Sequence, residues 1–402
     1  MKEWQELILS EITEPVKSTY IPKRDEQLAY IGLEHIEQQT LRLTGVGKSS
    51  DVTSNKFKFG ANDVLFGKLR PYFRKVYKPK FSGICSTDIW VFRAKKGFSQ
   101  DFLFYFLANR DFVDTANSGE GGTRMPRADW NFLKITNWLV PCEEEQKTIA
   151  SVLSSLDDKI DLLHRQNTTL ERMAETLFRQ WFVEEVQEDW EELPLGEVAT
   201  VQNGYAFSSS DYVEFQEGFL EVFKMGHIQP GGGLRFAPKA DFVPRTDKLK
   251  RWVLNKNDIV MAMTDMKDNM GILGHPALVD ISNKYALNQR VARIHLENSS
   301  KLNSIYLVYL QLSTEEAISL LQSKANSGVQ VNLTTEAIKS IPITIPPTSI
   351  QNRVLETIQP IFIKLNMNRS QIQTLEKLRD TLLPKLMSGE VRVALPSKEQ
   401  AA

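Results

Sequence analysis

Several residues of this 402-residue chain could serve as catalytic groups, but their spacing argues against an active site. The segment Gly45–Ser50 (GVGKSS) is similar to the end of a phosphate-binding loop of the form GxxxxGK[ST]. Arg42 occupies the position where such a loop needs its first glycine, and no apolar strand precedes the segment. We therefore predict a flexible loop here rather than a nucleotide-binding site.

The other possible catalytic groups do not form a recognisable set. None of the five histidines has a second histidine four residues away, as a helical metal site would require, and the chain has no GxSxG nucleophile motif. Asp211, Glu221 and Lys224 are the residue types of a nuclease centre, but their spacing is irregular and the set occurs once. The sequence therefore predicts neither a metal site nor a catalytic centre.

Basic residues interleaved with aromatic residues point instead to nucleic acid. Residues 56–96 hold eleven lysines and arginines against two aspartates, and residues 235–256 hold seven against two, although the whole chain has a net charge of −1. Clustered positive charge binds phosphates, while Arg, Gln and Asn can also read base edges. The predicted DNA-contacting residues are Lys56, Lys58, Lys68, Arg70, Tyr72, Arg74, Arg124, Arg127, Arg235, Lys239, Arg245, Lys250, Arg251, Gln289 and Arg290.

Composition predicts a cytoplasmic protein with an ordinary core. Apolar residues make up 42% of the chain and charged residues 25%, as in globular proteins. The first ten residues lack the pattern of a signal peptide, and no apolar stretch approaches membrane-spanning length. Cys85 and Cys142 are too few for a disulfide framework.

The chain contains an internal duplication. The tetrapeptide ANSG occurs at Ala116–Gly119 and at Ala325–Gly328, and about twenty residues later each copy has a proline followed five residues on by a glutamine. These pairs are Pro141 with Gln146 and Pro346 with Gln351. From there the two copies align without gaps, so the order and spacing of the motifs are repeated over about 190 residues.

Each copy is predicted to consist of an α+β head and one long helix. Apolar residues alternate in steps of four and three after each Pro…Gln pair, which is typical of a coiled-coil seam. Thr348–Gln351 has the pattern of a capping box for the second helix. The seam residues predicted to pair with each other or with a partner are Leu156, Ile160, Leu163, Asn167, Leu170, Leu177, Ile361, Leu365, Asn368, Ile372, Leu375 and Leu382.

We predict that the two helices are antiparallel, because the first begins with acidic residues and the second ends with basic ones. In that arrangement Asn167 and Asn368 should meet near an approximate twofold axis and fix the register. The expected architecture is two globular α+β domains held apart by two long antiparallel coiled-coil helices. The predicted domains are 1–142 (first head), 143–185 (first helix), 186–346 (second head), 347–390 (second helix) and 391–402 (tail).

Seven segments have the character of family motifs: Gly60–Val76, Ser82–Ala94, Val140–Ile160, Leu254–Asp265, Ala286–Ile294, Ile345–Val354 and Leu382–Val391. Through them the sequence resembles the specificity subunits of type I restriction–modification systems over essentially its whole length. Cys142 is a departure, because the family commonly has a second proline there, and it affects only the local loop.

The resemblance implies a non-catalytic, DNA-binding protein with two target recognition domains. Each head would read one half of a bipartite, asymmetric site in double-stranded DNA. The helices would set the spacer and dock two methyltransferase subunits, which nuclease/translocase subunits would join. S-adenosylmethionine, ATP and Mg would belong to those partners, so this chain would need no cofactor. Two alternatives remain from the residues alone: a coiled-coil adaptor without DNA binding, and a DNA-cleaving enzyme with an unrecognised centre.

Overall fold

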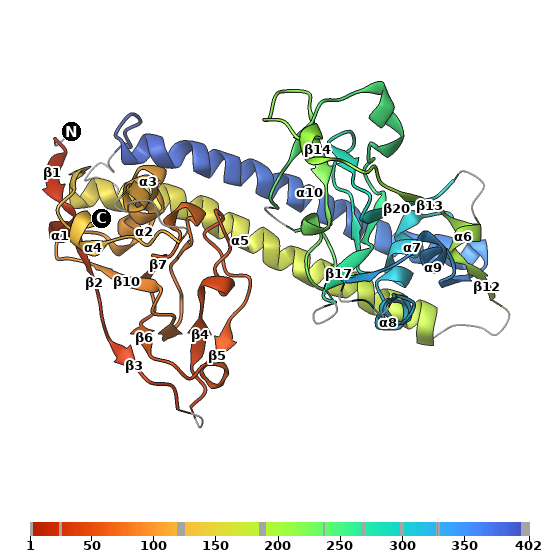
Figure 1. Ribbon diagram of the computed structural model, residues 1–402. Coiled ribbons are helices and arrows are strands. Elements are labelled where there is room, and N and C mark those ends of the chain that lie inside the picture. Colours follow the sequence, from red (N-terminus) through yellow and green to blue (C-terminus); the bar gives the residue numbers. More distant parts are fainter. Residues whose placement is uncertain are drawn as a thin grey trace. The chain divides into compact units, whose positions relative to one another are not determined.

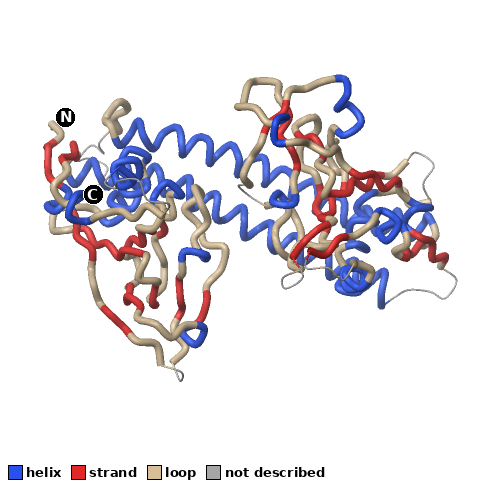
Figure 2. The backbone as a smooth tube through the Cα atoms, in the orientation of Figure 1, coloured by secondary structure: helices blue, strands red, loops and turns tan. Residues whose placement is uncertain are grey.

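The computed structural model describes residues 3–23, 26–118, 125–184, 190–235, 238–266, 270–297, 301–326, 328 and 330–394 (Figure 1). The chain divides into two units, residues 1–162 with 372–402 and residues 163–371. Each unit contains one head and a part of each long helix. Strands and loops make up much of each head, as the tube in Figure 2 shows.

The first head is built from eleven described strands and four short helices. Its strands are β1 Gln5–Ile8, β2 Thr13–Pro15, β3 Thr19–Tyr20, β4 Ala29–Ile31, β5 Gly47–Lys48, β6 Lys56–Phe59, β7 Val64–Gly67, β8 Val76–Tyr77, β9 Gly83–Cys85, β10 Ile89–Ala94 and β11 Asn137–Val140. Its helices are α1 Leu9–Ile12, α2 Gln100–Ala108, α3 Arg110–Ser118 and α4 Trp130–Leu133. The long helix α5, Glu143–Arg179, follows directly.

The second head has a similar order of elements, with an additional described strand, β21, between its helices α8 and α9. Its described strands are β12 Glu191–Pro194, β13 Thr200–Asn203, β14 Leu220–Phe223, β15 Phe242–Val243, β16 Ile259–Ala262, β17 Thr264–Met266, β18 Pro276–Leu278, β19 Tyr285–Leu287, β20 Val291–His295, β21 Gln330–Asn332 and β22 Pro342–Ile345. Its helices are α6 Leu195–Val198, α7 Ile305–Leu312, α8 Glu315–Ser323 and α9 Thr335–Lys339, and the long helix α10, Thr348–Met387, closes the chain.

Sheet topology confirms the duplication. The sheet β2-β10-β7-β8 of the first head has the same strand order as β13-β20-β16-β18 of the second, and the pair β1-β11 corresponds to β12-β22. Buried strand residues pack against the apolar helices α2 and α7 that follow each sheet. Both heads are therefore α+β domains with one shared plan.

The predicted flexible loop at Gly45–Ser50 is partly regular structure. Gly47 and Lys48 form β5, the edge strand of the sheet β3-β6-β9-β4-β5, and a short 3₁₀ turn follows. The Ser49 hydroxyl accepts a hydrogen bond from the Leu28 backbone N–H at 3.0 Å. The loop prediction is wrong at Gly47 and Lys48, because their pairing with β4 supplies order that the glycines alone do not reveal.

The repeated proline–glutamine pairs join each head to its long helix. In the first unit the buried Gln146 side chain donates to the Pro141 carbonyl at 2.9 Å and accepts from the Ser99 N–H at 2.9 Å. Ser99 caps α2, so one amide ties the start of α5 to the head.

In the second unit Gln351 makes the matching bonds. It donates to the Pro346 carbonyl at 2.9 Å and accepts from the Asn303 N–H at 3.0 Å. The predicted capping box at Thr348–Gln351 was therefore wrong: α10 already begins at Thr348, and the Gln351 amide is buried against the head.

The two long helices run antiparallel, as predicted. In the first unit Asp157 of α5 pairs with Arg379 of α10, whereas Glu145, twelve residues earlier, pairs with Arg392 beyond the end of α10. Two other acidic residues of α5 pair with the first head instead of with α10: Asp158 lies 3.4 Å from Lys80 and Asp161 lies 3.9 Å from Arg42. Overall charge complementarity between the helices is therefore smaller than the sequence suggests.

The predicted asparagine pair is confirmed. Asn368 Nδ2 donates to Asn167 Oδ1 at 2.9 Å, and both side chains are buried within the second unit. Because a buried amide without a partner is destabilising, this bond favours one register of the two helices.

Most predicted seam residues lie inside the helix pair or against a head. After Ala174 the buried positions are Phe178 on α5 and Phe182 in the π-helical turn Gln180–Glu184 that follows it. Leu177 is only half-buried, because the chain there packs on the core of the second head. The predicted seam members that are buried are Ile160, Leu163, Asn167, Ile361, Leu365, Asn368 and Ile372. Those that are half-buried are Leu156, Leu170, Leu177, Leu375 and Leu382.

A buried ionic cluster occupies the helix pair of the first unit. The Arg379 side chain is 1% exposed, and its guanidinium lies 2.8 Å from Asp157 and 3.2 Å from Asp380. Asp157 also accepts a hydrogen bond from the Tyr105 hydroxyl at 2.7 Å. Arg74 of the head reaches the same Asp380 at 3.4 Å, so the cluster connects the head to α10.

We expect Glu376, beside this cluster, to lower stability as pH rises. Burial raises its pKa to about 8; Asp380 and Glu37 add to the shift, while Arg379 and Arg42 oppose it. Glu376 is then protonated in the folded chain but ionised in the unfolded chain between about pH 4.5 and pH 8, so the free energy of unfolding falls across that window. Replacement by glutamine (Glu376→Gln) should remove about 2 kcal/mol of that fall, judged from roughly 1.4 kcal/mol per pKa unit and discounted for solvent screening.

Urea unfolding at pH 5, 6.5 and 8 measures this effect. The exposed Glu356→Gln on the same helix is the matched control. Parallel stability profiles for the wild type and Glu376→Gln would contradict the assignment.

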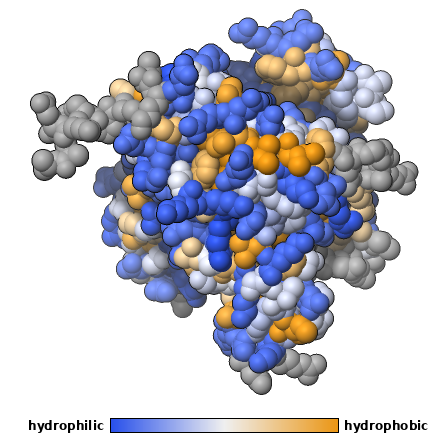
Figure 3. Space-filling model, turned by 90° about the vertical axis from the view of Figure 1, so that its left-hand side faces the viewer, coloured by the Kyte–Doolittle hydropathy of each residue, from blue (hydrophilic) through white to orange (hydrophobic). Residues whose placement is uncertain are grey.

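Among the described helices, none combines the length and apolarity that a bilayer span requires. Hydrophilic side chains cover most of the face drawn in Figure 3, where apolar side chains form small patches.

Candidate nucleic-acid interface

Three segments of the first head meet at the end of strand β7. The Lys68 N–H donates to the Asp88 carbonyl at 2.9 Å, and the Lys68 carbonyl accepts from the Ala128 N–H at 2.9 Å. The Arg70 N–H donates to the Pro126 carbonyl at 2.7 Å, and Leu69 forms a bridge with Arg127. These backbone bonds place the side chains of the three segments along one edge.

The second head makes the same connections at the end of β16. The Met263 N–H donates to the Arg290 carbonyl at 3.0 Å, and the Leu333 N–H donates to the Met263 carbonyl at 2.7 Å. Strand β17 then pairs with β21, with Thr264 opposite Asn332. We call these equivalent sites the first and second recognition edges: residues 68–70, 88 and 126–128, and residues 263–266, 288–290 and 330–333.

The first recognition edge is cationic. Partial burial lowers the pKa of Lys68; Arg127 and Lys17 act in the same direction, whereas Asp88 opposes them. Arg127 lies 3.3 Å from Asp88, yet its side chain is 53% exposed. An edge with more cations than anions is suited to phosphate or guanine contacts.

The second recognition edge is lined chiefly by amides and hydroxyls. Gln289, Arg290 and Gln330 are exposed there, and they border an open pocket of about 500 Å³ that Asn203 and Asn332 also line. The Thr264 hydroxyl donates to Asn332 Oδ1 at 2.8 Å. The two edges thus share a backbone frame but differ in their hydrogen-bonding groups.

Two predicted DNA contacts are buried and were wrong. Lys56 is 5% exposed, and its ammonium group donates to the Ser54 carbonyl at 2.9 Å and the Ser54 hydroxyl at 2.7 Å. Arg74 is 3% exposed, and its Nε donates to the Ala108 carbonyl at 2.6 Å. Both side chains satisfy groups inside the first unit. Arg124 lies outside the described residues.

The remaining predicted contacts lie at the surface, apart from Lys68 and Arg70, which are half-buried. Lys58 covers the Tyr20 ring, and Tyr72 is 42% exposed. In the second head the exposed members are Arg235, Lys239, Arg245, Lys250, Arg251, Gln289 and Arg290. Their contact with DNA stays a prediction.

Some of these surface residues have partners in the second head. Arg251 stacks on Trp252, whose indole N–H donates to the carbonyl of Asn203 at 3.1 Å, next to the open pocket. Lys250 pairs with Asp247 at 2.8 Å, and Arg245 bonds to the Asn283 carbonyl.

Sequence reasoning missed Lys17, Asn203, Gln330 and Asn332. The repeated ANSG motif held the signal, because each copy precedes the segment that completes a recognition edge, at Arg127 and at Asn332.

The possible nuclease residues do not converge. Glu221 accepts from buried His227 at 2.9 Å, Lys224 pairs with Asp241 at 2.6 Å, and Asp211 accepts from the Ser208 N–H at 2.6 Å. In the part of the chain that the structure describes, no group of three or more His, Cys, Asp or Glu side chains is placed to hold a metal ion.

Comparison with known proteins gives a consistent result. The family model described as type I restriction modification DNA specificity domain matches residues 1–172 and 187–377. The chain is 26% identical to the type I restriction enzyme MjaVIII specificity subunit of Methanocaldococcus jannaschii, over 89% of this chain and 86% of the relative. It is 21% identical to the HindI specificity subunit of Haemophilus influenzae, over 97% of this chain and all of the relative.

A solved structure has a similar fold. The S subunit of a type I restriction–modification system from M. genitalium superposes with a TM-score of 0.53 at 14% identity, covering 96% of each chain.

Proposed function

The chain belongs to the type I restriction–modification DNA specificity family, and from this premise we propose that each head reads one half of a bipartite DNA site through its recognition edge. The chain is a specificity subunit, a class that supplies target recognition rather than catalysis. The observation that carries the proposal is the repeated backbone frame at the ends of β7 and β16, which bears exposed polar side chains in both heads.

The long helices would set the spacer and dock two methyltransferase subunits. Each helix exposes two apolar side chains at positions that match in the gapless alignment: Leu162 and Met173 in α5, Met367 and Leu378 in α10. Exposed apolar side chains at repeated positions are suited to two copies of one partner. Nuclease/translocase subunits would join through the complex.

Cofactors would be held by those partners: S-adenosylmethionine by the methyltransferase subunits, and ATP and Mg by the nuclease subunits. The chain would act in the cytoplasm, where its DNA target is accessible; its two cysteines are free, as is usual for a protein of a reducing compartment.

We expect loss of exposed side chains at either edge to weaken DNA binding by the assembled methyltransferase complex. Lys68→Ala and Arg127→Ala test the first edge, and Gln289→Ala and Arg290→Ala test the second. A lost phosphate contact should weaken all sequences alike and reduce the salt slope by about 0.9, whereas a lost base contact should relax one position by about 1–3 kcal/mol.

Fluorescence anisotropy at several salt concentrations, with cognate DNA and single-base variants, measures both effects. Lys96→Ala is the matched control, because exposed Lys96 follows β10 at the end opposite Asp88. If all four edge variants bind like the control, the recognition edges are not the DNA-contacting surfaces.

A further inference from the structure

The site of the buried arginine cluster differs between the two repeats. In the gapless alignment of the long helices, Arg379 corresponds to Ala174 and Asp157 corresponds to Phe362. Two head residues near the cluster also have small counterparts. Arg42 corresponds to Gly233, since each directly precedes a residue of a matching isolated bridge, Leu43 with Ile36 and Leu234 with Ile228. Arg74 corresponds to Gly274, since both have positive φ and lie two residues before the matching strands β8 and β18.

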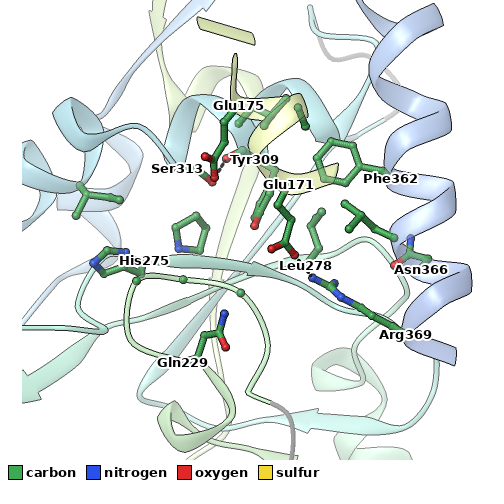
Figure 4. Close-up of a pocket in the computed structure, with 18 residues that line it drawn as sticks. Glu171, Glu175, Gln229, His275, Leu278, Tyr309, Ser313, Phe362, Asn366 and Arg369 are labelled. Atoms are coloured by element: carbon green, nitrogen blue, oxygen red, sulfur yellow. Dashed lines mark hydrogen bonds and ion pairs between the residues drawn. The ribbon is translucent and has the colours of Figure 1, made fainter. Parts of the chain in front are cut away.

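A cavity lies in the second unit where Ala174 and Gly233 replace two of these arginines; Gly274 does not line it. It has a volume of about 150 Å³ and is lined by Ala174, Gly233, Tyr309, Phe362 and two glutamates (Figure 4). Tyr309 is the counterpart of Tyr105, which in the first unit donates to the carboxylate that binds Arg379. A cavity of roughly this size can hold a molecule as large as benzene.

The second unit keeps carboxylates at this site although it lacks the arginines. Glu171 and Glu175 correspond to Glu376 and Asp380, and both point into the cavity in Figure 4. Arg369 lies 3.0 Å from Glu171. Glu175 is an exposed residue that lines the cavity, and it makes no ion pair within the described part of the chain. Partial burial and the nearby Glu171 raise the pKa of Glu175, whereas Arg172 lowers it, and a bound cation would also lower it.

We propose that this cavity binds a guanidinium group supplied from outside the chain, in the place that Arg379 fills in the other repeat. Glu175 would accept its hydrogen bonds, as Asp380 does from Arg379 at 3.2 Å. One face of the Phe362 ring is stacked on Tyr306, with ring centroids 4.4 Å apart, so only the other face would be available for the stacking that guanidinium groups favour. The expected source is an arginine side chain of a partner subunit; a small free guanidinium compound is the other source of the same chemistry.

The first test uses the isolated full-length chain and agmatine, a small guanidinium compound, so it does not depend on the proposed role in DNA recognition. Agmatine should raise the melting temperature of the wild type. Glu175→Gln should increase the agmatine concentration needed for this rise at least about tenfold, because it removes a charge-assisted hydrogen bond.

The variant Ala174→Arg restores the arginine of the other repeat and should fill the cavity. We expect its melting temperature to be at or above that of the wild type and not to change when agmatine is added. Ala150→Arg is the matched control: Ala150 is also buried on α5, but it lies in the apolar core of the first unit, so the variant should melt much lower.

Assembly with methyltransferase subunits distinguishes the two possible sources of the guanidinium group, a partner arginine and a small free compound. If Ala174→Arg weakens assembly about tenfold or more, a partner arginine occupies the cavity. If assembly is unchanged but the agmatine response is present and depends on Glu175, the occupant is a small free compound. Absence of an agmatine response together with unchanged assembly would overturn the proposal, whether or not the complex still reads DNA.

Discussion

Exchange of residues 1–142 for the first head of another family member should change one half of the methylated DNA site and leave the other half and the spacer unaltered. The physical reason is that the sheets of each head pack around a core within one unit, and each head bears its own recognition edge. The effect is a complete change of sequence at one half-site. Long-read mapping of methylated adenines in cells that carry the chimaera measures it.

The contacts between the first head and the long helices determine which donor heads are suitable. The donor must supply a backbone N–H where Ser99 binds Gln146, and an arginine that can replace Arg74 against Asp380. The reciprocal exchange of residues 186–346 is the control and should alter only the other half-site. Alteration of both half-sites by one exchange would show that the heads do not read independently.

Removal of the Arg379 guanidinium should produce a large loss of stability. Arg379→Met leaves Asp157 without its buried cation and Asp380 with Arg74 alone. Breaking a fully buried ion pair on one side costs about 3–5 kcal/mol, and the loss here should be smaller because Asp157 and Asp380 are 24% and 37% exposed. Calorimetry should show a lower melting temperature for the first unit. Arg353→Met, an exposed position on the same helix, should have little effect.

The second repeat suggests how the loss can be reduced. The double variant Arg379→Ala with Asp157→Phe copies the residues found at Ala174 and Phe362, where the helix pair folds without a buried arginine. It should recover part of the stability lost by Arg379→Met. A double variant that is less stable than Arg379→Met would mean that the two repeats are not interchangeable at this site.

The features that could be predicted from sequence are those that depend on repetition and periodicity. Apolar steps of four and three identified both long helices, and the mirrored positions of Asn167 and Asn368 predicted the hydrogen bond between them. These sequence patterns are sufficient to predict the arrangement because an antiparallel helix pair has few degrees of freedom.

Charge counting predicted the site less well. A count of lysines and arginines does not distinguish a side chain in water from one that is buried and bonded to carbonyl groups inside the protein, as Lys56 and Arg74 are. The recognition edges depend on backbone bonds between segments about 20 to 70 residues apart, such as Lys68 with Asp88 and Met263 with Leu333. No local pattern records such pairings.

The asparagine pair also discriminates between possible dimers of separated half-chains. Asn167 and Asn368 do not occupy equivalent positions in the two repeats. In the sequence alignment Leu163 corresponds to Asn368, and Ile372 corresponds to Asn167. Two copies of the first repeat, paired in the same geometry, would bury each asparagine against a leucine, and two copies of the second would bury each against an isoleucine. Every mismatch leaves a buried amide unsatisfied at a cost of about 1–3 kcal/mol. Unlike halves would therefore associate in preference to like halves. A gene split between the repeats would still give a complex of two different half-chains, which would recognise an asymmetric DNA site.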